Sequence, residues 1–167
     1  MHDPEAKAKQ PQEATGAALS LHLKAKAQRC NLPPIRQCLE GVLRGWRQPS
    51  LEEEEVGEIL LALLEACSNV IAHAYQGREV DDIEIDTRLD PIGITITIKD
   101  RGVGFDLEAV PPPKFGRKPA LGGYGLYMMR GLMDLVRVSR DGGETVLTIT
   151  RRWRSSPTGT PGAEASR

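Results

Sequence analysis

The sequence has little net charge, and this scarcity excludes whole classes of partner. Lys and Arg together number 22 against 23 Asp and Glu, so the formal net charge is -1. A chain so balanced has no general attraction to nucleic acid or to an anionic membrane surface. We therefore expect neither a direct nucleic-acid partner nor a membrane partner.

Cysteines are also scarce. Cys30, Cys38 and Cys67 are odd in number and lack C-x-x-C spacing, which argues against a disulfide framework or a zinc site and suits a reducing compartment. The opening sequence MHDPEAKAKQPQEATG has no apolar signal-peptide segment. No stretch approaches the roughly 18 apolar residues of a membrane span. These features predict a cytoplasmic protein.

The two ends differ in composition from the middle of the chain. Residues 1–16 and 154–167 are rich in Pro, Gly, Ala and small polar residues, and such segments bury too little apolar surface to offset their ordering entropy. We expect both to be disordered tails. The remaining residues, 17–153, suit one folded domain.

Hydrophobic periodicity within residues 17–153 predicts an α+β domain. The expected elements in order are a strand (18–24), a helix (34–46), a helix opened by a capping box at Ser50 and Glu53 and ending before Gln76, two strands (82–90 and 92–99), a long irregular connection (100–124), a helix (124–135) and two strands (135–140 and 144–153). The first helix should bury Ile35, Cys38 and Leu39 on one face. Helices on one face of a mostly antiparallel mixed sheet form a two-layer sandwich.

The second helix ends in EACSNVIAHAY, in which Glu65, Asn69 and His73 are four residues apart and share one face. Burying such groups is costly unless each has a partner. A carboxylate in a partly apolar site gains basicity and suits a general base, and an amide oxygen can complete magnesium coordination beside phosphate oxygens. The competing interpretation is an exposed Glu65 with Asn69 and His73 bonded to neighbouring loops, which we favour for His73.

A second motif, DRGVG, begins where a strand ends, at Asp100. A carboxylate there can accept a hydrogen bond from the exocyclic amine of a purine. Gly102 and Gly104 allow the backbone to turn sharply and approach a flat ring. A tight turn without any ligand would need the same glycines.

The third motif, GGYGL, contains Gly122, Gly123, Gly125 and Leu126 and opens a helix. Free N–H groups and the positive end of the helix dipole favour phosphate binding there, although a flexible loop end explains the glycines as well. Lys114, Arg117 and Lys118 lie just upstream and are candidates to close on a polyphosphate or merely to solubilise the loop. The chain has neither a Walker A sequence nor a glycine cluster in a βαβ unit.

The three motifs in this order resemble the GHKL superfamily of ATPases, which includes gyrase, heat-shock chaperone, histidine kinase and mismatch-repair types and has the Bergerat fold. EACSNVIAHAY is most similar to the anti-sigma-factor serine/threonine kinases, and the resemblance covers roughly residues 17–153. It implies ATP and Mg²⁺ as cofactors, Glu65 as the general base and Asn69 as the metal ligand. It further implies these nucleotide-binding residues: Asn69, Asp100, Gly102, Gly104, Gly122, Gly123, Gly125 and Leu126.

The resemblance also implies a function. Such a protein sequesters an RNA polymerase sigma factor and phosphorylates a Ser or Thr of an anti-anti-sigma (STAS-type) protein. Homodimers are common in the family, and the strand at residues 18–24 is a candidate contributor to one. The sequence departs from the family in two places: Pro119, Ala120 and Leu121 stand where some members have an Arg, and Glu144 precedes Thr145 where related ATPases often have a Thr near adenine.

Three alternatives stay open at this stage. A non-catalytic nucleotide-binding partner-switching module would share the motifs but not the activity, and the missing Arg favours it. The ATP-binding half of a histidine kinase would need a dimerisation helix with a phosphorylatable His, and His22 lies in a strand pattern instead. A structural adaptor would have no need of the three motifs.

Overall fold

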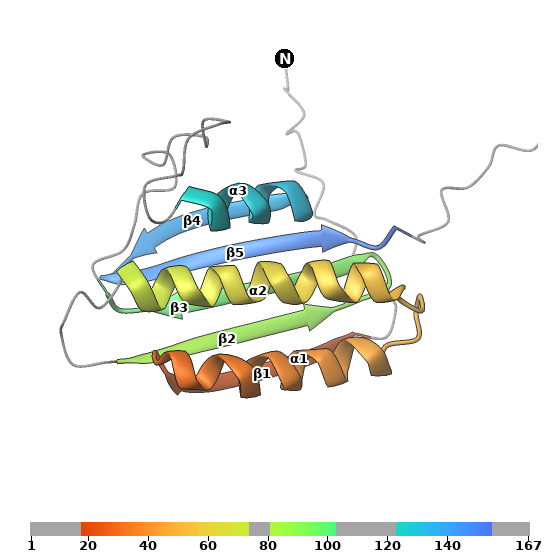
Figure 1. Cartoon of the computed structure of the whole chain (residues 1–167), viewed down its shortest axis with the longest axis horizontal. Coiled ribbons are helices and arrows are strands. Elements are labelled where there is room, and N and C mark those ends of the chain that lie inside the picture. The colour runs from red at the N-terminus through yellow and green to blue at the C-terminus, as the bar shows by residue number, and fades with distance from the viewer. Residues whose placement is uncertain (1–17, 74–80, 103–122, 155–167) are drawn as a thin grey trace, which may run out of the picture.

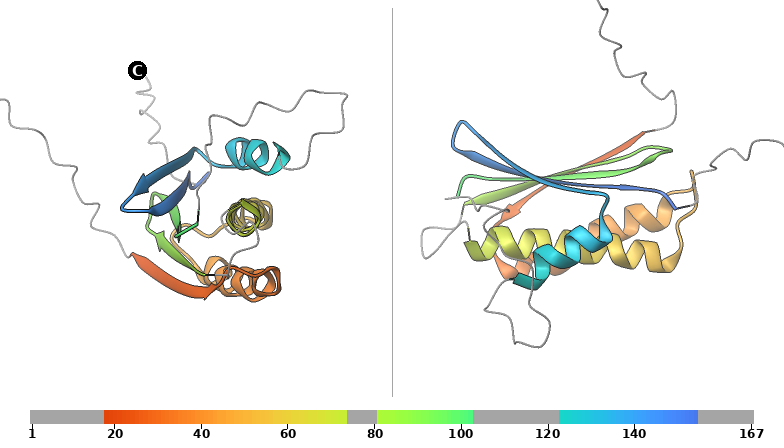
Figure 2. Two further views of the ribbon diagram at one scale, coloured as in Figure 1. Left: turned by 90° about the vertical axis from the view of Figure 1, so that its left-hand side faces the viewer. Right: turned by 90° about the horizontal axis from the view of Figure 1, so that it is seen from above.

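A five-stranded sheet carries three α-helices on one face, and no described helix covers its other face, called the uncovered face below (Figures 1 and 2). The computed structural model describes residues 18–73, 81–102 and 123–154. The elements are β1 (Leu19–Lys26), the 3-10 helix η1 (Arg29–Asn31), α1 (Leu32–Gly45), α2 (Glu53–His73), β2 (Asp82–Leu89), β3 (Gly93–Asp100), α3 (Gly123–Leu132), β4 (Leu135–Asp141) and β5 (Glu144–Arg152). The predicted α+β two-layer architecture is confirmed.

The strands lie in the order β1-β2-β3-β5-β4. All four pairings between these strands are antiparallel, so the expected mixed sheet has no parallel pair in the described part of the chain. The β3–β5 pairing sets Asp100 opposite Thr145, and the β4–β5 pairing sets Arg140 opposite the same threonine. Directly opposed residues of a sheet share one face.

Alternation along the strands builds the core. In β2 and β3 the isoleucines Ile83, Ile85, Ile96 and Ile98 are buried beneath the helices, because successive side chains of a strand point to opposite faces. The intervening polar residues lie on the uncovered face, where ammonium groups of β1 pair with carboxylates of β2. Lys24 lies 2.9 Å from Glu84, and Lys26 lies 2.9 Å from Asp82.

Helix α1 begins two residues earlier than predicted. Pro33 and Pro34 occupy its first turn, where the missing amide hydrogens are not needed and the fixed φ suits a helix. Ile35 and Leu39 are buried as expected, but the prediction for Cys38 was wrong, because its side chain is exposed. Cys38 lies at the border of the apolar face of the helix, where hydrophobic periodicity does not predict whether a side chain is buried or exposed.

Helix α2 begins at Glu53, so Ser50 is not its N-cap residue and the capping-box prediction was wrong. Ser50 instead forms an isolated bridge with Arg47. The first turn of α2 contains Glu53, Glu54 and Glu55, which suits the positive end of the helix dipole. None of the described helices is both long and apolar enough to cross a membrane.

Candidate functional site

The three sequence motifs meet at one end of the molecule. The C-terminal end of α2, the C-terminal end of β3 and the N-terminal end of α3 all lie on the left in Figure 1, with α3 beside α2. The motifs are separated in sequence, and the fold brings two of them to one end of the helical layer and the third to the same end of the sheet. This arrangement defines the candidate site.

Glu65 and Asn69 lie on α2 one helical turn apart, and both are partly buried. The exposed-glutamate interpretation of Glu65 is therefore wrong: its carboxylate lies against α3. His73 is the last residue of α2, and its side chain lies outside the described part of the structure.

Gly125 of α3 packs directly on the polar stripe of α2. A Cβ atom built at Gly125 would lie 2.3 Å from Oε2 of Glu65 and 3.7 Å from Nδ2 of Asn69. A side chain at position 125 would therefore displace the Glu65 carboxylate, so the glycine allows the two groups to lie this close. The contact joins the first and third motifs and places Glu65 and Asn69 beside the first turn of α3, which also holds Gly123 and the buried Leu126.

Asp100 ends β3 and is buried, with only 2% of the residue exposed. Its Oδ1 accepts a hydrogen bond from the backbone N–H of Gly102 at 2.8 Å. Burial raises the pKa of Asp100, although the Gly102 hydrogen bond and the charge of Arg140 lower it in part. A buried carboxylate with one backbone donor keeps acceptor capacity for an amine.

Thr145 lies opposite Asp100 on β5 and is 1% exposed. Its Oγ1 has no hydrogen-bond partner among the described residues. A buried hydroxyl without a partner costs about 1–3 kcal/mol, so this atom suits a ligand that supplies the missing bond. The sequence analysis treated Glu144-Thr145 as a departure. The pairing of β5 with β3 identifies Thr145, because it places this residue on the face of Asp100, whereas Glu144 lies on the other face.

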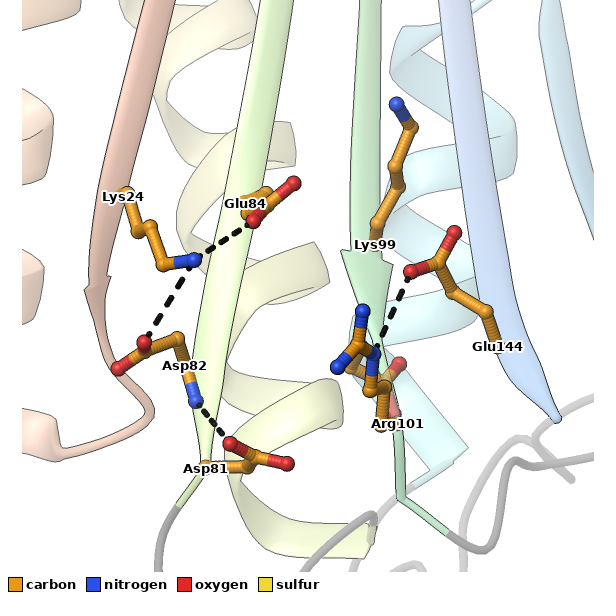
Figure 3. A pocket seen from close by; sticks show the side chains of 8 residues that line it. Lys24, Asp81, Asp82, Glu84, Lys99, Arg101 and Glu144 are labelled. Atoms are coloured by element: carbon orange, nitrogen blue, oxygen red, sulfur yellow. Dashed lines mark hydrogen bonds and ion pairs between the residues drawn. The ribbon is translucent and has the colours of Figure 1, made fainter.

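The uncovered face beneath Asp100 holds a small pocket that is lined by charged groups (Figure 3). Its lining residues are Lys24, Asp81, Asp82, Glu84, Lys99, Asp100, Arg101 and Glu144. The cations there are paired: Lys24 contacts Glu84 at 2.9 Å, and Arg101 lies 3.8 Å from Glu144. The lining has more carboxylates than cations, so it disfavours a phosphate, and we assign the candidate site to the helical side.

Several predicted residues lie outside the described residues, namely Gly104, Gly122, Lys114, Arg117, Lys118, Pro119, Ala120 and Leu121. Their contribution to the site stays a prediction. The structure brings together Glu65, Asn69 and Gly125 and, separately, Asp100 and Gly102.

Two observations fit a bound purine nucleotide. The Thr145 hydroxyl, unpartnered among the described residues and opposite Asp100, suits the edge of a base. The N-terminus of α3 lies beside Glu65, and helix N-termini commonly bind phosphate. Among the described residues no three His, Cys, Asp or Glu side chains gather as a metal site. Magnesium in phosphoryl-transfer sites usually takes one or two protein oxygens together with phosphate oxygens, and the Asn69 amide is the candidate here.

Thr145→Val is expected to stabilise the ligand-free protein by about 1 kcal/mol, because it removes a buried, unpartnered hydroxyl without changing the shape of the side chain. The same change should weaken ATP binding about fivefold to tenfold, because the lost hydroxyl contributes about 1 kcal/mol in the complex. Denaturant unfolding and calorimetric titration measure the two effects. Thr148→Val on the uncovered face is the control and should leave ATP affinity unchanged; parallel loss in both variants would contradict the assignment.

ATP affinity is expected to fall on acidification at a pH above the ordinary range for an aspartate. Burial raises the pKa of Asp100, and the protonated carboxyl loses acceptor capacity. In the ligand-free protein the sign is opposite: a raised folded pKa stabilises the fold at low pH, and that contribution is lost as the pH rises through it. Titrations across the acidic range test this, and Asp100→Asn should bind weakly with no such pH dependence.

Comparison with known proteins identifies the family. The family described as histidine kinase-like ATPase domain matches residues 25–151. The chain therefore belongs to the histidine kinase-like ATPase domain family. It is an ATP-binding family, and the Bergerat-type arrangement of the motifs agrees with it.

Curated relatives and a solved structure agree with this family. Serine-protein kinase RsbW of Bacillus pumilus is 35% identical over 102 residues, which are 56% of this chain and 63% of that protein. Anti-sigma F factor of Bacillus thuringiensis is 34% identical over 102 residues, covering 59% of this chain and 70% of that protein. The crystal structure of the RsbU and RsbW domains of a Mycobacterium tuberculosis protein shares the fold, with a TM-score of 0.56, 20% identity and coverage of 81% of this chain and 32% of that one.

Proposed function

We propose that the chain is an ATP-dependent serine/threonine protein kinase that also sequesters an RNA polymerase sigma factor. Its phosphate acceptor would be an anti-anti-sigma protein. The contact between Gly125 and the Glu65–Asn69 stripe carries the proposal, because it sets a carboxylate beside a helix N-terminus that suits phosphate. The names of the relatives, a serine-protein kinase and an anti-sigma factor, support the same function.

Each residue has a separate task in this proposal. Asp100 and Thr145 hold the base edge of ATP, the carboxylate as acceptor and the hydroxyl as donor or acceptor. The first turn of α3, with Gly123 and Gly125, holds the phosphate chain through backbone N–H groups.

Glu65 acts on the incoming hydroxyl of the acceptor protein. Its carboxylate orients the Ser or Thr hydroxyl and accepts its proton as the new O–P bond forms and the terminal phosphate leaves ADP. Asn69, one turn further along α2, offers an amide oxygen to magnesium, which would neutralise charge on the phosphates. Both side chains are held by the close packing of α2 on α3.

The second candidate is a nucleotide-binding partner-switching module without kinase activity. The stretch Pro119-Ala120-Leu121 favours it, since some family members have an Arg there. Loss of a cation at the terminal phosphate would remove much transition-state stabilisation while leaving base recognition intact. The two candidate functions both require ATP binding, and only the kinase requires transfer of the terminal phosphate to a partner protein.

The experiment compares host cells that carry the wild-type chain, affinity-tagged, with cells that carry a tagged Glu65→Gln variant. Mass spectrometry of the purified complexes should find a sigma factor with both proteins. A Ser or Thr phosphopeptide from an anti-anti-sigma protein should appear with wild type alone. A sigma factor with no such phosphopeptide would favour the non-catalytic module, and the absence of any sigma factor would contradict the anti-sigma proposal.

A further inference from the structure

Helices α2 and α3 are connected at two places, once by a direct contact and once through a side chain of β5. At the candidate site Gly125 meets Glu65. At the other end Arg151 of β5 bridges Glu58 of α2 and the backbone carbonyl of Leu132, the last residue of α3. Glu58 and Glu65 are seven residues apart, as are Gly125 and Leu132, and seven residues of helix span about 10 Å.

The matched spacing means that the two helices run antiparallel in a fixed register. The N-terminal end of α3 lies beside the C-terminal half of α2, and the two helices lie side by side in Figure 2. Seven residues are nearly two full turns, so Glu58 and Glu65 share the side of α2 that faces α3. A constraint at the Glu58 end therefore fixes the axial position of α3 at the Glu65 end.

Arg151 is built to be such a constraint. Its side chain is only 5% exposed, and its guanidinium reaches three groups at once. Nη2 donates to Oε2 of Glu58 at 2.5 Å, Nη1 donates to the Leu132 carbonyl at 2.9 Å, and Nε lies 3.8 Å from Oε1 of Glu55. The planar guanidinium of an arginine has N–H donors in fixed directions and so holds its partners at set relative positions. The ammonium group of a lysine, on a flexible chain, does not.

The hydrogen bond from Arg151 to Leu132 satisfies a backbone carbonyl at the C-terminus of α3. The last four carbonyls of a helix have no intrahelical partner, and a cation near them also interacts well with the helix dipole. Arg151 supplies both the donor and the charge at the C-terminus of α3. The same guanidinium therefore ties the end of α3 to α2.

Two acidic partners hold the guanidinium of Arg151 in place. Burial alone would raise the pKa of Glu58, but hydrogen bonds from Arg151 and Arg154 outweigh it and the pKa lies below its ordinary value. Glu55 is 1% exposed and accepts a hydrogen bond from the backbone N–H of Arg154 at 3.1 Å. A buried ion cluster adds little net stability over an apolar one, and its best-attested use is to set register.

We infer that Arg151 is a positioning residue of the nucleotide site, which sets the register of α3 against α2 and so places the first turn of α3 over Glu65. The inference rests on the proposed function, because it assigns phosphate binding to that turn. Arg151 itself contacts Glu58 and Leu132, about two helical turns from the contact between Glu65 and Gly125. Asp100 and Thr145 lie on β3 and β5 and not on α3, so we expect base recognition to be unaffected by the register of α3.

The test compares the affinities of ATP and adenosine for wild type, Arg151→Lys and Arg154→Lys. Arg151→Lys keeps a positive charge beside Glu58 but loses the fork that also reaches Leu132. We expect its Kd for ATP to rise about tenfold, a change of about 1.4 kcal/mol, and its Kd for adenosine to stay within about twofold. Arg154→Lys alters another arginine that contacts Glu58 and should change neither Kd.

Two results would overturn the inference in a folded Arg151→Lys protein: an unchanged Kd for ATP, or equal weakening of ATP and adenosine. Should that variant not fold, Glu58→Gln provides the same comparison, with a smaller expected rise for ATP alone. If wild type binds neither ligand, the proposed function fails. Hydrogen exchange of the ligand-free protein then still tests the register. The backbone amides of α3 should exchange faster in Arg151→Lys than in Arg154→Lys, and equal exchange rates would refute the role of Arg151 in fixing the register.

Discussion

Glu65→Gln should lower the rate of phosphoryl transfer about 1,000-fold while leaving the Kd for ATP within about threefold. Glutamine keeps the size of the side chain and its place against Gly125 but accepts no proton, and a positioned general base contributes about 10²–10⁴-fold. Single-turnover transfer to the acceptor identified by its phosphopeptide measures the rate, and calorimetry measures the affinity.

The control for this prediction is Glu54→Gln in the first turn of the same helix. The Glu54 side chain is 78% exposed and remote from the site, so both rate and affinity should match wild type. A wild-type rate of phosphoryl transfer in Glu65→Gln would show that Glu65 is not the general base. ATP binding without transfer in wild type as well would instead establish the non-catalytic module.

Gly125→Ala is predicted to lower the rate of phosphoryl transfer about 100-fold or more without unfolding the protein. The added methyl group would lie 2.3 Å from Oε2 of Glu65, and the carboxylate must move because it is the flexible end of its side chain. A displacement of about 1 Å in a catalytic group costs about 100-fold or more in rate. The stability of the fold should hold or rise, since alanine is favoured over glycine in a helix by about 1 kcal/mol.

Gly131→Ala in the same helix separates the two effects. A Cβ atom at Gly131 would meet nothing within 4 Å, so this variant gains helix propensity without steric conflict and should retain wild-type transfer. Rates and unfolding free energies of both variants, measured side by side, give the answer. Equal activity of the two alanine variants would show that the contact between Gly125 and Glu65 has no catalytic importance.

Local sequence signals predicted most of the fold. The alternation of isoleucines in β2 and β3 specifies a half-buried sheet, and the long apolar stripe specifies α2. Boundaries moved by up to three residues where local signals competed, as at Ser50, whose capping pattern yielded to a bridge with Arg47. A cap is worth about 1 kcal/mol, which tertiary contacts readily override.

The site was only partly predictable because part of it depends on pairing between distant segments. Glu65 and Asn69 follow from helical spacing within one motif. Thr145 becomes a site residue only when β5 pairs with β3 and sets it opposite Asp100. The bridge from Arg151 to Glu58 joins residues 93 apart in sequence, and the acidic run at the start of α2 gave no sign that Glu55 would be buried beside it.

Titration of ATP into the purified protein, with and without magnesium, tests the central claim most directly. The account predicts that wild type binds ATP, that magnesium strengthens the binding, and that Asn69→Ala keeps binding but loses the strengthening. Ser68→Ala, one residue away on the same helix, should behave as wild type. Wild-type protein that binds no ATP in either condition would contradict the account.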